Sequence, residues 1–182
     1  MQKSTDNTTT FCAFLRGVNV KGTNMKMAEV CAVFEKAGMN NVTFVLASGN
    51  ILFTSSKRKE ELKQSLEKAM SAYFNYEAFL FLKTKKEIED IVAKCPFQPN
   101  PASHIYGFAG IDGIEKILQE EFEKCSYTAM EKVAIIENNF YWQLPKGNTL
   151  ASEFGKILGR KNLKNAFTSR NLNTFEKILK KS

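Results

Sequence analysis

Apolar residues recur along this chain with two different periods, which together predict a mixed protein of strands and helices. Short runs that are apolar on both faces, such as 11–15, are typical of buried strands. Segments with an apolar residue at every third or fourth position, such as 27–34, are typical of amphipathic helices. These patterns predict strands at 11–15, 42–46, 51–53, 78–82, 104–109, 133–136 and 140–144. They predict helices at 25–37, 59–74, 85–94, 113–124 and 149–158, with a last helix after 168–171.

The order of these elements predicts two similar halves. The first half has the βαββαβ order of a ferredoxin-like plait. The second half repeats the order strand, helix, hairpin, helix, and Pro96, Pro99 and Pro101 interrupt the chain between the halves. We therefore expect an α+β fold of two ferredoxin-like (α/β-plait) halves packed into one compact unit. The expected segments are a disordered N-terminal lead at 1–10, a first plait at 11–83, a linking helix and Pro-rich connection at 84–101, and a second plait-like half with basic helices at 102–182.

Local signals refine this outline. A plait covers one face of its sheet with helices, whereas several predicted strands are apolar on both faces. We therefore expect the second half or a partner chain to cover the other face.

Asn24 is the expected N-cap of the first helix and Gly38 its C′ residue. Asn138-Asn139 is the expected turn of a hairpin.

The main candidate site is the polar turn after the first strand. Residues 15–24 leave an apolar strand, pass through two glycines and enter a helix, and such a turn presents backbone N–H groups that suit an anion. In a βαββαβ plait, the turn at 48–50 lies at the same sheet edge. The residues expected at this edge are Arg16, Gly17, Asn19, Lys21, Asn24, Ser48, Gly49 and Asn50. Arg16 offers a planar fork of donors to a phosphate or carboxylate. In the alternative interpretation, the asparagines cap turns and Arg16 pairs with an acidic neighbour.

A further polar cluster, 168–174, adjoins the last helix. It lies before and within the first turn of that helix, so part of it is expected to cap the helix. Arg170, Asn171 and Asn173 provide more polar groups than a cap needs. We expect them to join the first cluster if the last helix packs beside it.

Common catalytic and cofactor motifs are missing from the sequence. There is no Gly-x-Gly-x-x-Gly dinucleotide motif and no Gly-Lys-Ser/Thr phosphate loop, so we expect no cofactor. A single histidine, His104, excludes multi-histidine metal sites, and we interpret it as a structural residue at a strand start. The four widely spaced cysteines are typical of reduced core residues, and no metal site is expected. Tyr141-Trp142 could stack a base, although strand alternation places one or both in the core.

Positive charge is concentrated at the C-terminal end of the chain. Residues 146–182 hold nine Lys and Arg against two Asp and Glu, which accounts for the whole net charge of +7. This imbalance indicates either a nucleic-acid footprint or a solvated helix face. No run approaches the roughly 18 apolar residues that span a membrane. The first ten residues are polar, so we expect a cytoplasmic protein without membrane contact.

The polar clusters also resemble the signatures of a known family. Residues 15–20 (Leu-Arg-Gly-Val-Asn-Val), 48–50 (Ser-Gly-Asn) and 168–174 (Thr-Ser-Arg-Asn-Leu-Asn-Thr) resemble, in order and spacing, three motifs of the bacterial domain-of-unknown-function family 1697. The resemblance spans nearly the whole chain and implies two α/β-plait-like halves with no established activity. Leu172 stands where the family usually has Trp, which puts a stacking role there in doubt. Glu153 stands where the family has Lys, so a basic contact there is lost or reversed.

We therefore expect a small protein that binds a phosphate-bearing molecule, either a nucleotide or a nucleic acid, as a monomer or weak homodimer. One alternative is an enzyme that acts on a small anionic substrate, with Arg16 and Arg170 as charge stabilisers. That enzyme lacks an evident base or activated nucleophile. The other alternative is a module that pairs with a second copy through an apolar sheet face.

Overall fold

The computed structural model describes residues 8–18 and 24–182, and the chain divides into two compact units. The first unit ends at Glu87 and also includes Lys177–Ser182, while Ile88–Glu176 form the second unit. Most of the lead expected at 1–10 lies outside the described residues, but Thr9 and Thr10 already belong to the first strand, where they pair with Ser55 and Thr54.

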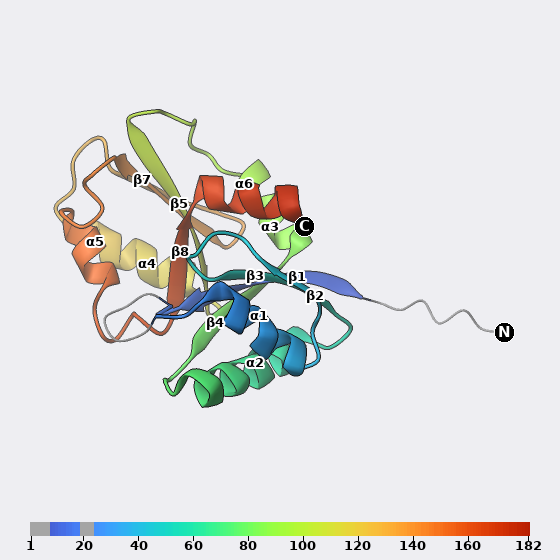
Figure 1. Cartoon of the computed structure of the whole chain (residues 1–182). Coiled ribbons are helices and arrows are strands. Elements are labelled where there is room, and N and C mark those ends of the chain that lie inside the picture. The colour runs from blue at the N-terminus through green and yellow to red at the C-terminus, as the bar shows by residue number, and fades with distance from the viewer. Residues whose placement is uncertain (1–7, 19–23) are drawn as a thin grey trace. The chain divides into compact units, whose positions relative to one another are not determined.

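The first unit is a ferredoxin-like plait. Its elements are β1 (Thr9–Arg16), α1 (Met27–Lys36), β2 (Asn40–Phe44), β3 (Asn50–Ser55), α2 (Lys59–Phe74) and β4 (Phe79–Thr84). The sheet has the order β2-β3-β1-β4, and all neighbouring strands are antiparallel. Helices α1 and α2 cover one face of it (Figure 1). Alternate residues of β1 pack into this core, where the rings of Phe34 and Phe53 meet edge to face at 5.6 Å. The predicted fold of the first half is therefore confirmed.

The second unit repeats this topology. Its elements are β5 (Ser103–Gly110), α4 (Ile114–Glu123), β6 (Lys132–Ile136), β7 (Asn139–Pro145), α5 (Glu153–Leu158) and β8 (Phe167–Asn171), and its sheet has the order β6-β7-β5-β8. The sequence pattern did not predict β8, because 168–171 were expected only to lead into the last helix. They instead pair antiparallel with β5, from Gly110↔Phe167 to Tyr106↔Asn171. The second half is thus a complete plait.

Each plait is followed directly by a helix, α3 (Lys85–Ala93) after β4 and α6 (Leu172–Lys181) after β8. Thr84 and Glu87 form a reciprocal capping box on α3, in which each side chain accepts the backbone N–H of the other residue. In the second unit, both helices approach Gly107 of β5. A β-carbon there would lie 2.9 Å from Phe175 of α6 and 3.3 Å from Ile91 of α3. At Gly107, the second face of this sheet is therefore covered by the parts of α3 and α6 that belong to the second unit.

Several predicted boundaries differ from the structure, and three of the differences concern helix caps or a turn. Helix α1 begins at Met27 with Lys26 at its N-cap rather than Asn24, although Gly38 follows its end with φ +87° as expected. Helix α5 begins at Glu153, not near 149, because the Ser152 hydroxyl caps it by accepting the Gly155 N–H. The β6–β7 hairpin turns at Glu137-Asn138, one residue earlier than predicted, since these two residues have positive φ.

Across the described ranges, no helix has both the length and the apolar character needed to cross a membrane.

Candidate ligand-binding sites

The end of β1 and the turn at 48–50 are in direct contact, as the plait topology predicts. The backbone N–H of Leu15 donates to the carbonyl oxygen of Gly49 at 2.8 Å. Gly49 has φ +78°, and a β-carbon there would lie only 2.6 Å from Cγ2 of Val18. Glycine at 49 thus permits both the left-handed backbone and the close approach of the two segments.

Asn50 stabilises the turn from within. Its side chain is fully buried, and its Nδ2 donates to the carbonyl oxygen of Val45 at 2.8 Å and to the hydroxyl of Ser48 at 2.9 Å. The backbone N–H of Val45 donates in return to the Asn50 carbonyl at 2.9 Å. Both bonds donated by the Asn50 amide are therefore made within the turn. The role of Asn50 at this sheet edge is to stabilise the backbone conformation of the turn.

Arg16 is the last residue of β1 and lies opposite Phe79 of β4. It is half-buried, and burial lowers the pKa of its guanidinium from the ordinary value. Because the ordinary pKa of arginine is above 12, the group keeps its charge at neutral pH. A half-buried cation is screened less by water than an exposed one, so it interacts more strongly with an anion.

Tyr76 lies beside the turn that follows Arg16. A β-carbon at Gly17, which has φ +76°, would lie 3.9 Å from Cε2 of the Tyr76 ring. The Tyr76 hydroxyl is buried and has no hydrogen-bond partner among the described residues. Burial, followed by the charge of Glu67, raises the pKa of this hydroxyl to about 12, so it remains a donor at neutral pH. Tyr76 was not predicted as a site residue, since a tyrosine between a helix and a strand belongs to no sequence motif.

The structure describes only some of the other residues that were expected at this edge. Asn19 and Lys21 lie outside the described residues. Asn24 is exposed and lies three residues before the start of α1. Of the described members of this cluster, Arg16, Gly17 and the turn at 48–50 lie where β1 meets that turn.

The C-terminal cluster belongs to the second unit. Nη1 of Arg170 donates to the hydroxyl of Thr168 at 2.6 Å and to the carbonyl oxygen of Ser169 at 2.9 Å, so one arm of its fork binds its own strand. Oδ1 of Asn171 accepts the Asn173 N–H at 3.1 Å, which caps the start of α6.

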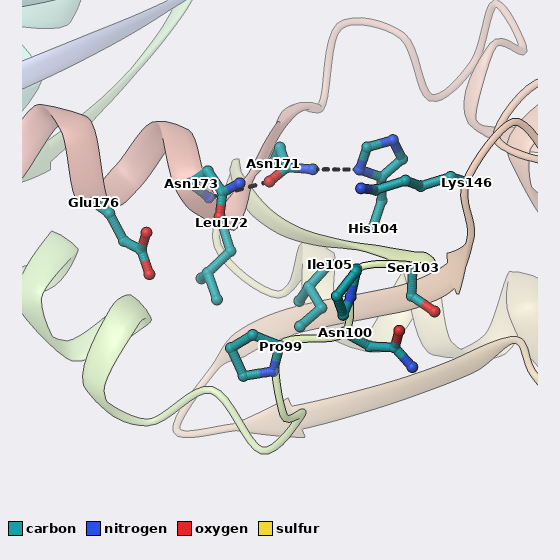
Figure 2. A pocket seen from close by; sticks show the side chains of 11 residues that line it. Pro99, Asn100, Ser103, His104, Ile105, Lys146, Asn171, Leu172, Asn173 and Glu176 are labelled. Carbon is teal, nitrogen blue, oxygen red and sulfur yellow. Dashed lines mark hydrogen bonds between the residues drawn. The ribbon is translucent and has the colours of Figure 1, made fainter.

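A pocket of about 420 Å³ lies beside this cap, between the start of β5, the end of β7 and the first turns of α6 (Figure 2). Asn171, Leu172 and Asn173 line one side of it. The remaining lining residues are Pro99, Asn100, Pro101, Ser103, His104, Ile105, Lys146 and Glu176. Arg170 does not line it. Of these pocket residues, the sequence patterns had selected only Asn171 and Asn173 for a site.

His104 is part of this pocket and is bonded to the cap. Nδ2 of Asn171 lies 2.9 Å from Nδ1 of His104 (Figure 2). Since Oδ1 of Asn171 already accepts a backbone N–H, its nitrogen must face the ring and donate. Nδ1 therefore accepts, and the neutral ring carries its proton on Nε2. The sequence predicted only a structural role for His104 and did not predict that it lines a pocket.

Other candidate groups do not form sites. The described residues contain no cluster of three His, Cys, Asp or Glu that could hold a metal ion. All four cysteines are free thiols, and burial raises the pKa of Cys31, Cys95 and Cys125. Tyr141 and Trp142 are both buried, so neither ring is exposed to stack a base.

Fold and site together define a class of α+β protein in which two ferredoxin-like plaits, each extended by a helix, present polar turns at their sheet edges. The chain belongs to the family described as "Protein of unknown function (DUF1697)", whose model matches residues 8–141. This match confirms the resemblance drawn from the motifs and includes two of them, while 168–174 lie beyond it.

The solved structure of a conserved bacterial protein from Streptococcus pneumoniae is similar to this chain. The two share 21% sequence identity with a TM-score of 0.76, over 95% of this chain and 98% of the other. At this identity the likeness shows the fold alone. No curated protein matches the chain.

Proposed function

We propose that this protein binds a phosphate-bearing ligand, a nucleotide or a nucleic acid, at the edge of the first sheet where β1 ends beside the turn at 48–50. The observation that carries this proposal is the contact between Leu15 and Gly49, which fixes two glycine-containing turns side by side next to Arg16. Glycine allows a ligand to approach the backbone closely, and an arginine fork matches the oxygens of a phosphate.

Two features of this edge support an anionic ligand. Arg16 is half-buried, so its charge is less screened than that of a surface arginine. The Tyr76 hydroxyl beside Gly17 is a buried donor with no partner among the described residues. Leaving such a group without a partner costs about 1–3 kcal/mol, and a ligand oxygen would remove that cost.

The charge of the C-terminal residues favours a nucleic acid as the ligand. The second unit exposes four cations within nine residues, Lys156, Arg160, Lys161 and Lys164. Arg160 lies 3.6 Å from the Glu121 carboxylate, and the other three form no ion pair with a described residue. Exposed cations of this kind attract a polyanion at long range and release its counterions on binding.

Fluorescence anisotropy with labelled single-stranded RNA and DNA, and calorimetry with ATP, test this proposal. We expect saturable binding of at least one of these probes at low salt. For RNA or DNA, affinity should fall steeply as salt rises. We expect Arg16→Ala to weaken binding about tenfold or more, since it removes a charge-assisted hydrogen bond.

Arg58→Ala is the matched control, because it removes the same charge from the same unit at an exposed ion pair with Glu61. Flat titrations with all three probes at low salt, or equal losses in both variants, would contradict the proposal. Binding of ATP but neither oligonucleotide would identify the ligand as a nucleotide.

A further inference from the structure

The pocket beside the Asn171 cap carries opposite charges at its two ends. Figure 2 shows Lys146 beside His104 at one end and Glu176 at the other, with Leu172 and Ile105 between them. The backbone explains this separation. Lys146 directly follows β7, and its N–H donates to the carbonyl oxygen of Ala102 at 2.9 Å, next to the start of β5. Glu176 lies one helical turn beyond Leu172 along α6.

No side chain in the described part of the protein neutralises these two charges. Neither Lys146 nor Glu176 forms an ion pair with another described residue. Lys146 is exposed and Glu176 half-buried, so both side chains can reach a ligand in the pocket. A lysine and a carboxylate that share a pocket without pairing present one site for an anionic group and another for a cationic group.

An apolar surface lies between the two charged ends of the pocket. Leu172 and Ile105 are buried, with 7% and 6% of their surfaces exposed, and Pro99 adds a further apolar surface. The volume of about 420 Å³ lies within the range of about 300–1,000 Å³ that is typical of small-molecule sites. A ligand that fits must therefore be small and apolar between its charged ends.

We propose that this pocket is a second binding site, specific for a small zwitterion whose carboxylate and ammonium groups are separated by an apolar segment. Lys146 and the Nε2–H of His104 bind the carboxylate, Glu176 binds the ammonium group, and Leu172 and Ile105 contact the apolar segment. A simple anion such as phosphate fits less well, because Glu176 repels it. This proposal uses residues of the second unit and does not depend on the proposed function of the first.

Linear ω-amino acids of four to eight carbons test the proposal, since they vary only the separation of the two charges. Each is compared with its N-acetyl derivative, which lacks the ammonium group, and its carboxamide, which lacks the carboxylate. Binding is followed through the backbone amide NMR signals of His104, Leu172 and Asn173. Titration to about 20 mM nearly saturates even a site with a millimolar Kd.

We expect one chain length to bind best and both derivatives to bind more weakly. Glu176→Gln should weaken the zwitterion about fivefold, the upper end for a surface ion pair, but should not weaken the N-acetyl derivative, which has no ammonium group for Glu176 to bind. Lys146→Gln should weaken both of these compounds and spare the carboxamide. Glu89→Gln and Lys116→Gln, which change exposed charges of the same unit outside the pocket, should have no effect.

Three results would overturn the inference: no saturable shift with any chain length, equal affinity for the zwitterion and its N-acetyl derivative, or inorganic phosphate binding as tightly as the best zwitterion. A loss of nucleic-acid or ATP binding in Arg16→Ala is a separate result and has no bearing on this pocket.

Discussion

Asn171 links the start of α6 to the start of β5 through His104, whose Nδ1 lies 2.9 Å from the Asn171 amide nitrogen. The other end of the same amide accepts the Asn173 N–H at 3.1 Å. One side chain therefore caps a helix and fixes the tautomer of a pocket histidine. This residue is part of a motif that resembles the family signature, and the structure gives it a definite local role.

Replacing Asn171 should destabilise the protein. Asn171→Ala removes the helix cap, which is typically worth about 1 kcal/mol, and leaves His104 without its donor. We expect the free energy of unfolding in urea to fall by about 1–2 kcal/mol. Asn173→Ala, which changes an exposed side chain two residues away, should change it by less than about 0.5 kcal/mol. Equal effects of the two variants would show that the amide is not a cap.

A β-carbon at Gly49 should separate the two turns of the first unit. Gly49→Ala incurs the cost of a left-handed backbone and also places a methyl group 2.6 Å from Val18. Gly38→Ala incurs only the backbone cost, because nothing lies within 4 Å of its β-carbon position. We expect Gly49→Ala to lower the free energy of unfolding by at least about 1 kcal/mol more than Gly38→Ala, as overpacking does. Calorimetric unfolding of both variants measures the difference.

Glu87 should make the stability of the protein depend on pH. Burial alone would raise the pKa of this carboxyl, but hydrogen bonds from Lys59 and the Thr84 N–H, together with the charges of Lys83 and Lys59, outweigh burial and hold the pKa below its ordinary value. A lowered folded-state pKa stabilises the protein above the unfolded-state pKa of about 4.3, and this stabilisation is lost as pH falls through the folded-state pKa.

We therefore expect the stability difference between the wild type and Glu87→Gln to be constant near neutral pH and to shrink below about pH 4. Urea unfolding across this range measures it. Glu89→Gln, at an exposed position of the same helix, is the control. A stability difference that grows as pH falls would contradict the lowered pKa of Glu87.

Side chains of α2 satisfy the exposed edge of β4. Oε1 of Glu67 accepts the Leu80 N–H at 3.1 Å, and Nζ of Lys63 donates to the Leu80 carbonyl oxygen at 2.9 Å. These two side chains also bond to each other. Since β4 is an edge strand, they occupy backbone groups that another strand could otherwise bind.

Glu67→Ala should expose the Leu80 amide. We expect its native-state hydrogen exchange to accelerate about tenfold, which corresponds to the loss of one charge-assisted hydrogen bond. Amides in the centre of β1 should keep their rates. Glu60→Ala, at an exposed position of α2, is the control, and an unchanged Leu80 rate in Glu67→Ala would contradict the assigned contact.

The first plait could be predicted from sequence because its strands and helices differ sharply in period. Helix α2 was predicted with both of its ends correct. The strand β8 could not be recognised in the same way, because four of its five residues are polar and its pairing with β5 uses backbone groups. The pattern of apolar and polar side chains along the chain does not indicate backbone pairing of this kind.

The missing strand also explains why the pocket escaped prediction. Antiparallel pairing of β5 with β8 places the start of one beside the end of the other, and so brings His104 to Asn171. Without β8, nothing in the sequence connects these residues. In the first unit, the plait topology was sufficient to predict that residues 48–50 lie beside the end of β1. It could not show that the Asn50 amide faces inward, because that depends on tertiary packing.

The last six residues of the chain, Lys177–Ser182, complete the unit that the first residues begin. Nζ of Lys181 donates to the Phe44 carbonyl oxygen at 2.7 Å, and Lys85 donates to the backbone oxygen of Ser182 at 3.1 Å. During synthesis on the ribosome, the first plait therefore emerges long before these contacts can form, and the second plait is translated in between. A nascent chain arrested before residue 177 would hold every strand that the structure describes and still lack part of its N-terminal unit.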